Sequence, residues 1–317
     1  MQKKITRRTF LKKCLWISAL TTIHIITSKT RGLFGEALPD YEGTAGDIPD
    51  LVGITGGKPV AMFEKGIEAF GGMSYFIKKG ETVVVKPNIG WDKTPEEGAN
   101  TDPDLVGAIV RHCVGCGAKK VWVFDHTCNN WKACYENSGI KQAVEDNGGM
   151  MVPAHAEQYY GRVTVPHSDV IRQALVHETL LEADRFINVP VLKHHGSARV
   201  TISMKNLMGV VYDRGYFHTT GLHECIADFA ALRKPDVVIV DAYRVMLKNG
   251  PRGVSPNDIA YKRMQVISTD MVAADAAGAK IFGVEPETIP HIARAHQKGV
   301  GRMDLDNLRI QRIKMAG

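Results

Sequence analysis

The stretch FINVPVLKHHGSARVTISMKNLMGVV, residues 186–211, decides how the rest of the chain is interpreted, because it joins an apolar segment directly to charged side chains. Residues 186–192 are rich in β-branched and aromatic side chains and have polar residues on both sides, which predicts a buried strand. Lys193, His194 and His195 follow at once in a predicted loop. Ligands of open α/β sheets bind outside the carboxyl ends of the strands. We therefore expect this loop to lie at the functional edge of a sheet.

A helix is predicted next, over residues 200–211, where apolar side chains recur at helical spacing. Lys205 and Asn206 lie near its middle, between apolar neighbours. Those neighbours indicate that the helix is packed against the protein. We therefore expect Lys205 to emerge into a cleft, where it can pair with an anion or a carboxylate.

The same stretch resembles the DUF362 family, a domain of unknown function, in which an Asn-x-Pro strand leads to Lys-x-His and then to Met-Lys-Asn-Leu-Met-Gly. Four further segments carry the resemblance: VVVKPNIG (83–90), VWVFDHTCNNWKACYENSGI (121–140), VIVDAYRVMLKNGPRG (238–253) and ISTDMVAADAAG (267–278). The resemblance implies a fold and a site region, but not a reaction.

Some members of that family carry an appended ferredoxin-like iron–sulfur domain, which implies electron transfer. No run of closely spaced cysteines follows Cys225 in this sequence, so we expect no such domain here. Any electron transfer would then need another cofactor or a redox partner.

Strand and helix patterns alternate along the chain, from a helix at 59–71 and a strand at 81–89 to a helix at 272–282. This alternation predicts an α/β fold with a mainly parallel sheet and helices on both faces. Residues 155–185 show polar alternation instead and are interpreted as an antiparallel insertion or edge hairpin. The segment at 308–313 is expected to add an edge strand.

The N-terminus predicts export. It reads ITRRTFLKK followed by an apolar run of about 14 residues, which is typical of a twin-arginine signal and short for a spanning helix. The alternative is a basic N-terminal helix. We interpret residues 1–31 as the signal, either removed or kept as an anchor, 32–57 as a linker, and 58–317 as a single domain. The expected partners are the twin-arginine export machinery and a redox partner or membrane complex, and the expected location is the periplasm or the outer face of the membrane.

The net charge of +6 gives no argument for nucleic-acid binding. Eight of the 40 basic residues lie in residues 1–31, where there is no acidic residue, so 32 basic and 34 acidic residues remain for the rest of the chain. Binding to nucleic acid would need basic residues clustered on the folded domain. We therefore expect no nucleic-acid partner.

The six cysteines include two pairs of interest. Cys113 and Cys116 have CxxC spacing, but both fall on a predicted helix and Cys113 belongs to its apolar stripe, which favours a role in the core. Cys128 and Cys134 flank a loop after a predicted strand. They form a local disulfide, act as a pair of thiolate ligands, or are two unrelated loop cysteines.

Polar side chains recur at or just after the predicted strand ends. Carboxylates there suit metal binding or acid–base catalysis, lysines suit an anionic group, and imidazole suits a metal or proton transfer. The Lys-x-His of the family selects His195, whose alternative role is a loop histidine bonded to backbone. We assign a catalytic role to His195, Lys193 and Lys205, cofactor binding to Lys86, Asn88, Asn206 and Asp241, and metal binding to Asp125, Cys128, Cys134 and His195.

Two functions follow from these assignments. The first is an exported enzyme or redox protein that holds a metal ion or redox cofactor at the carboxyl edge of the sheet. The second is a non-catalytic accessory protein that binds a ligand or cofactor at the membrane. Both require the assigned residues to converge on one pocket, because parallel strands joined by right-handed crossovers place their carboxyl ends on one edge.

Overall fold

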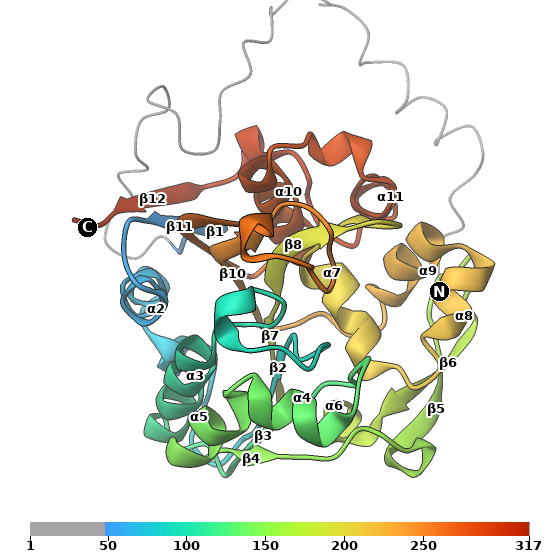
Figure 1. The fold of residues 1–317 in the computed structure, drawn as a ribbon, viewed down its shortest axis with the longest axis horizontal. Coiled ribbons are helices and arrows are strands. Elements are labelled where there is room, and N and C mark those ends of the chain that lie inside the picture. The colour runs from blue at the N-terminus through green and yellow to red at the C-terminus, as the bar shows by residue number, and fades with distance from the viewer. Residues whose placement is uncertain (1–47, 317) are drawn as a thin grey trace, which may run out of the picture. The chain divides into compact units, whose positions relative to one another are not determined.

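A computed structural model describes residues 48–316, which fold around a largely parallel sheet (Figure 1). The order of the main strands is β12-β1-β11-β10-β7-β2-β3-β4, and β8 and β9 extend the sheet beside β10. The strands of this sheet are β1 Leu51–Thr55, β2 Thr82–Pro87, β3 Lys120–Val123, β4 Met150–Met151, β7 Arg185–Val189, β8 Val191–His195, β9 Arg199–Thr201, β10 Val237–Met246, β11 Ile259–Ser268 and β12 Ile310–Lys314. The predicted α/β fold with a mainly parallel sheet is confirmed.

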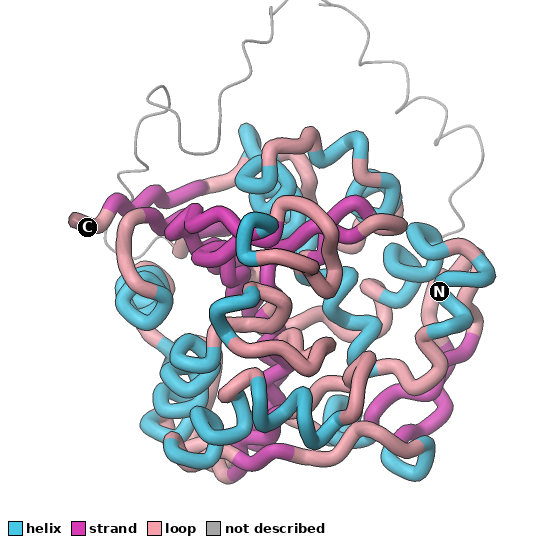
Figure 2. Tube along the Cα trace, viewed as in Figure 1, coloured by secondary structure: helices cyan, strands magenta, loops and turns pink. Residues whose placement is uncertain are grey.

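Helices cover both faces of the sheet, as Figure 2 shows by colour. The helices α2, α3 and α5 pack with one apolar core, and α7, α9 and α10 with another. Alternate side chains of the strands enter the two cores, because successive residues of a strand point to opposite faces. The helices are α2 Pro59–Glu68, α3 Pro103–Gly115, α4 Trp131–Asn137, α5 Ile140–Asp146, α6 Glu178–Glu182, α7 Ser203–Asn206, α8 Gly215–Thr220, α9 Leu222–Phe229, α10 Met271–Phe282 and α11 Pro290–Gln297.

Antiparallel pairing is confined to particular places. The strands β5 Tyr160–Thr164 and β6 Gln173–His177 form a separate two-stranded hairpin, so the antiparallel insertion expected at 155–185 is confirmed. Within the main sheet β11 runs antiparallel to both β1 and β10, and β9 runs antiparallel to β8. The strand β12 adds the expected edge strand parallel to β1.

Three predicted boundaries were wrong. The segment expected as a linker contains β1, whose first four residues are buried between β11 and β12. The expected loop at Lys193–His195 continues as strand, because β8 pairs with β10 and β9 after a break at Pro190. The helix expected over 200–211 is the short α7 followed by a 3₁₀ turn at Leu207–Val210, since residues 199–201 pair as β9 instead.

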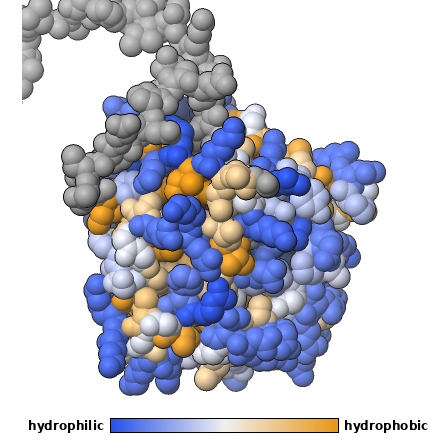
Figure 3. Space-filling view, turned by 90° about the vertical axis from the view of Figure 1, so that its left-hand side faces the viewer, coloured by the Kyte–Doolittle hydropathy of each residue, from blue (hydrophilic) through white to orange (hydrophobic). Residues whose placement is uncertain are grey.

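The described part of the chain contains no helix long and apolar enough to cross a membrane. On the face shown in Figure 3 the surface is mainly hydrophilic, with hydrophobic residues scattered among the polar ones. The predicted signal at 1–31 lies outside the described residues.

Candidate functional site

A cavity of about 230 Å³ lies where β2, β3 and β8 end and α7 begins. It gathers eight of the ten residues that the sequence assigned to a site. Its walls are formed by Lys86, Asn88, Gly90, Trp91, Asp125, Cys128, Lys193, His195, Thr201, Lys205, Asn206, Met208, Gly209, Arg214, His218 and Pro251.

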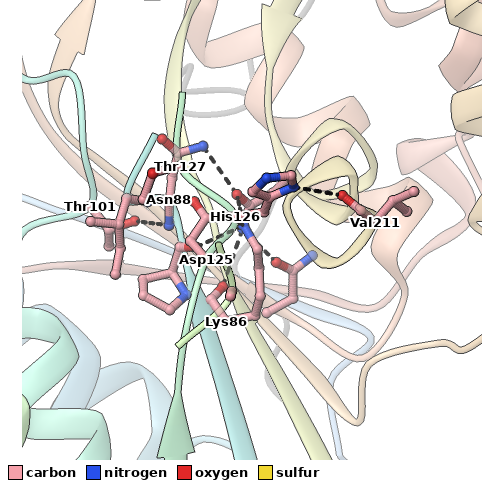
Figure 4. Close-up of polar contacts among 12 residues, drawn as sticks. Lys86, Asn88, Thr101, Asp125, His126, Thr127 and Val211 are labelled. Atoms are coloured by element: carbon pink, nitrogen blue, oxygen red, sulfur yellow. Dashed lines mark hydrogen bonds and ion pairs between the residues drawn. The ribbon is translucent and has the colours of Figure 1, made fainter. Parts of the chain in front are cut away.

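A buried ion pair forms the floor of this pocket. Lys86, at the end of β2, places Nζ 2.9 Å from Oδ1 of Asp125, just beyond β3 (Figure 4). The other carboxylate oxygen of Asp125 accepts a hydrogen bond from the backbone N–H of Ile89 at 2.6 Å. Burial lowers the pKa of Lys86, while the carboxylate of Asp125 acts in the opposite direction. The pair holds the ends of the two strands in register with each other.

Amide side chains connect the ion pair to α7. Asn206 accepts a hydrogen bond from Lys86 Nζ at 2.7 Å through Oδ1, and its amide nitrogen donates to Asn188 Oδ1 at 2.8 Å. The amide nitrogen of Asn88 donates to the same Asn206 oxygen at 3.1 Å. Asn206 is therefore committed to the protein, which explains why an amide is buried at the end of α7.

Lys193 extends from β8 into the back of the pocket and is almost fully buried. Its Nζ donates to Asn88 Oδ1 at 3.1 Å and to the backbone carbonyl of Ala99. Burial lowers the pKa of Lys193 to about 7, and the nearby Lys205 and Lys86 act in the same direction. Both acceptors are uncharged, so the amine of Lys193 is hydrogen-bonded but no carboxylate balances its charge.

Lys205 differs from the other two lysines because its ammonium has no hydrogen-bond or ion-pair partner among residues 48–316. Burial lowers its pKa to about 8, with a contribution from the positive charge of Arg214. The hydroxyl of Thr201, also in the pocket wall, is buried and lacks a partner within the same described residues. Desolvated polar groups without partners are costly, so both point to a ligand that would bond to them.

The carboxylate of Asp275 fixes the helix that carries Lys205. It lies on α10 and accepts hydrogen bonds from the backbone N–H groups of Ser203 at 2.6 Å and Met204 at 3.1 Å. These are the first free N–H groups of α7, so Asp275 acts as a cap supplied by another helix. Burial raises the pKa of Asp275 to about 7.

His194 and His195 point to opposite sides of β8, as expected for neighbours on an extended backbone. His194 Nδ1 accepts a hydrogen bond from Gly250 N at 3.1 Å, outside the pocket wall. His195 lines the pocket, where its Nδ1 accepts from Ala198 N at 3.1 Å and its ring stacks on that of His218 at 6.2 Å. Burial lowers the pKa of His195 to about 3, so its ring is neutral at pH 7.

Arg214 was missed by the sequence analysis. It follows the 3₁₀ turn and donates to the backbone carbonyls of His126 and Thr127, which brings its guanidinium against the loop after β3. His126 in turn places Nδ1 3.0 Å from the carbonyl oxygen of Val211 (Figure 4). An arginine soon after the Met-Lys-Asn-Leu-Met-Gly segment was the available signal, but nothing in its spacing indicated which loop it would contact.

This pocket is built almost entirely from the segments that carry the family resemblance. Residues 83–280 match the family described as a domain of unknown function, DUF362. The chain belongs to the DUF362 family. All of the pocket residues lie inside the matched range.

The DUF362 chain is also similar to a curated protein and to solved structures. It is 25% identical over 242 residues to a thylakoid-associated protein of Synechocystis, a match that covers 74% of this chain and 73% of that protein. Among solved structures, it matches the lactate racemase apoprotein of Thermoanaerobacterium thermosaccharolyticum at 12% identity and a TM-score of 0.41, and a Thermotoga maritima protein at 10% identity and a TM-score of 0.43. These matches cover 78% and 76% of this chain but only 56% and 60% of those two structures.

Asp241 does not belong to the pocket, although the sequence analysis placed it there. It is buried in β10, where Oδ2 accepts from the backbone N–H of Asp102 at 2.9 Å and Oδ1 accepts from that of Tyr243 at 3.0 Å. Burial and the neighbouring Asp102 carboxylate raise the pKa of Asp241 to about 6. Asp241 therefore holds the start of α3 against β10. It does not reach the pocket, because β10 continues past this residue.

The four residues expected to bind a metal are not gathered into a metal site. Cys134 is buried in α4 and lies outside the pocket, whereas Cys128 is an exposed pocket residue. Both are free thiols in the structure, so the disulfide, one of the three alternatives, is not formed. In the described ranges no three His, Cys, Asp or Glu side chains are placed to hold a metal ion together. Cys113 is fully buried, in line with the core role favoured for it.

Proposed function

We propose that this DUF362 protein binds the anionic group of a small molecule in the pocket and exchanges a proton with it through Lys205. The observation that carries the proposal is the half-buried Lys205 ammonium, which lacks a partner within residues 48–316 and lines a cavity with Lys193 and Arg214. A charged amine is costly to bury alone, and an anion in the cavity would offset that cost.

The charge of the pocket supports an anion over a cation. The carboxylate of Asp125 is matched by Lys86 at 2.9 Å, and His195 is neutral at pH 7 because its pKa is lowered to about 3. Lys193, Lys205 and Arg214 then leave an excess of positive charge. Carboxylate and phosphate groups are the anions that lysine and arginine bind in proteins.

Proton transfer is supported by the titration of Lys205. A general acid or base works best when its pKa is near the working pH. Burial brings the pKa of Lys205 to about 8, so both its protonated and neutral forms are populated near neutral pH. A non-catalytic binding site would gain nothing from an amine that loses its charge in this range.

An organic cofactor with an anionic group fits the same pocket. Lys193, Lys205 and Arg214 would hold its anionic group, and the cofactor would supply redox or electrophilic chemistry that lysine and histidine lack. A metal ion bound by side chains alone fits less well, because the described residues do not bring three suitable ligands together.

Calorimetry with matched ligands tests this function. Phosphate, pyrophosphate and small 2-hydroxy and 2-oxo carboxylates should bind at pH 7, while the neutral amides of those carboxylates should not. Lys205→Met should weaken binding at least about tenfold, the equivalent of 1.4 kcal/mol. Lys65→Met, which removes an exposed lysine on α2, is the matched control and should bind normally.

Proton NMR in D₂O separates an enzyme from a binding protein. With the wild type, deuterium should replace hydrogen on the carbon next to the acid group of a bound carboxylate. With Lys205→Met it should not. Anion binding without exchange in any carboxylate would favour the second candidate, a ligand-binding accessory protein. No binding of any anion would contradict the proposal.

Export through the twin-arginine pathway is a separate proposal, supported by Arg7, Arg8 and the apolar run that follows them. Cell fractionation should find the protein outside the cytoplasmic membrane. The double change Arg7→Lys/Arg8→Lys should leave it in the cytoplasm, and unchanged export of this variant would exclude the pathway.

A further inference from the structure

The thiol of Cys128 is exposed to the pocket, which sets it apart from the other cysteines of residues 48–316. Cys113, Cys134 and Cys225 are fully buried, and Cys116 is partly exposed at the end of α3 and is not part of the pocket wall. Cys128 therefore has access both to solvent and to anything that the pocket binds.

Two contacts hold Cys128 in this position. Its backbone N–H donates to the carbonyl of Gly90 at 2.7 Å, and the carbonyl of the preceding residue, Thr127, accepts from Arg214. The loop after β3 is thus tied to the loop after β2 on one side and to a pocket cation on the other. These contacts fix the loop that carries the thiol at the pocket.

Three lysines share the cavity with this thiol. Lys86, Lys193 and Lys205 all line the same cavity as Cys128 and lie within electrostatic range of its sulfur. The positive charge of these lysines would attract an anionic reactant toward the sulfur.

The hydroxyl of Thr201 is a second and independent sign of a ligand at this place. It is 4% exposed, it lines the cavity, and its oxygen has no partner within the described part of the chain. A ligand oxygen in the cavity would satisfy it. A small molecule whose carboxylate binds at Lys205 could therefore carry a second oxygen atom that bonds to Thr201.

We infer that Cys128 is a nucleophile that adds to the electrophilic carbonyl carbon of a small carboxylate, such as a 2-oxo acid, bound by the pocket lysines. The sulfur–carbon bond forms while the π bond of the carbonyl opens toward its oxygen. The thiol proton passes to the new alkoxide, so no oxidant or further reactant is needed. The inference rests on the anion site proposed above.

Paired alkylating reagents test the attraction of anions to the sulfur. Full-length protein is treated with iodoacetate or iodoacetamide, and the rate at each cysteine is followed by peptide mass spectrometry. Relative to Cys116 in the same molecule, Cys128 should favour the anionic reagent by at least about tenfold, which one nearby cation can supply. Lys205→Met should reduce this preference. Equal preference at Cys128 and Cys116 would overturn the inference.

Carbon-13 NMR with labelled glyoxylate tests the addition itself. The wild type should show an adduct signal of a tetrahedral carbon that Cys128→Ser lacks, and no such difference would overturn the addition. Calorimetry on Cys128→Ser separates the two proposals. If this variant and the wild type bind anions equally, and Cys128 shows no preference for iodoacetate over iodoacetamide, only the role of Cys128 fails. If the wild type binds no anion, the proposed function fails as well.

Discussion

Lys86 and Asp125 form an ion pair of 2.9 Å at the end of one strand and just beyond the next, and Gly209 packs directly against it. Both charged side chains are at most 3% exposed. The carbonyl of Gly209 also accepts a hydrogen bond from His126 N at 2.9 Å. One glycine therefore lets the 3₁₀ turn after α7 close over the ion pair and completes the pocket floor.

Replacing that glycine should disrupt the site. A Cβ at position 209 would lie 1.7 Å from Asp125 Oδ1 and 2.6 Å from Lys86 Nζ, which is too close for either atom to remain. Gly209→Ala should lower the free energy of unfolding by about 3 kcal/mol, as expected for overpacking a buried site. Urea denaturation measures the change. Gly115→Ala is the control, because its Cβ would meet no atom within 4 Å, and equal stability of the two variants would contradict this role.

Removing the cation of the pair should cost more than removing a surface lysine. Lys86→Met leaves the Asp125 carboxylate buried without its partner, and we expect a loss of about 3 to 5 kcal/mol in the free energy of unfolding. Lys65→Met removes an exposed partner of Glu68 and should change it by less than about 1 kcal/mol. A small effect of Lys86→Met would show that the pair contributes little to the fold.

The affinity for anions should fall as the pH rises. Burial lowers the pKa of Lys193 to about 7 and that of Lys205 to about 8, so both amines lose their charge between pH 7 and 9. An anion binds the charged forms, so its affinity should drop by up to about tenfold per pH unit for each lysine above the pKa of that lysine. Calorimetry from pH 6 to 9.5 measures this. A flat profile for the wild type would rule out the lysines as the anion contacts.

The same lysines predict the opposite trend for stability. Their pKa values lie below the ordinary value of 10.5, so the unfolded chain binds more protons than the folded one between about pH 7 and 10.5. Their contribution to the free energy of unfolding should therefore rise with pH across this window. The comparison of wild type with a Lys193→Met/Lys205→Met variant isolates it, because the variant should lack this rise.

Asp275 should matter for binding although it does not touch the pocket. Asp275→Asn replaces one of two acceptors for the N–H groups of Ser203 and Met204 with an amide donor, which should free the start of α7 and move Lys205. We expect a loss of about 1 to 3 kcal/mol in stability, together with weaker anion binding measured by calorimetry.

Asp241→Asn is the matched control for that change. Asp241 is another buried carboxylate that accepts two backbone hydrogen bonds, but it holds α3 and lies away from the pocket. Its replacement should lower stability while leaving the anion affinity unchanged. If both variants bind anions equally well, Asp275 has no positioning role.

The sequence by itself determined the α/β fold, the parallel order of most strands and the region of the site. Strand and helix periodicity depend on local patterns of apolar residues, and parallel strands must share a carboxyl edge. Lys86, Asn88, Asp125, Lys193 and Lys205 could therefore be assigned to one edge from their places after predicted strands.

The tertiary structure alone decided which of those residues share the pocket. Asp241 and Cys134 follow the same local patterns as the pocket residues, but the strand of one continues past the edge and the helix of the other turns its thiol into the core. Arg214 and Thr201 reach the pocket through a turn and a strand that periodicity did not predict. Whether a side chain is buried, paired or left without a partner depends on contacts between segments far apart in the chain, and no local pattern contains that information.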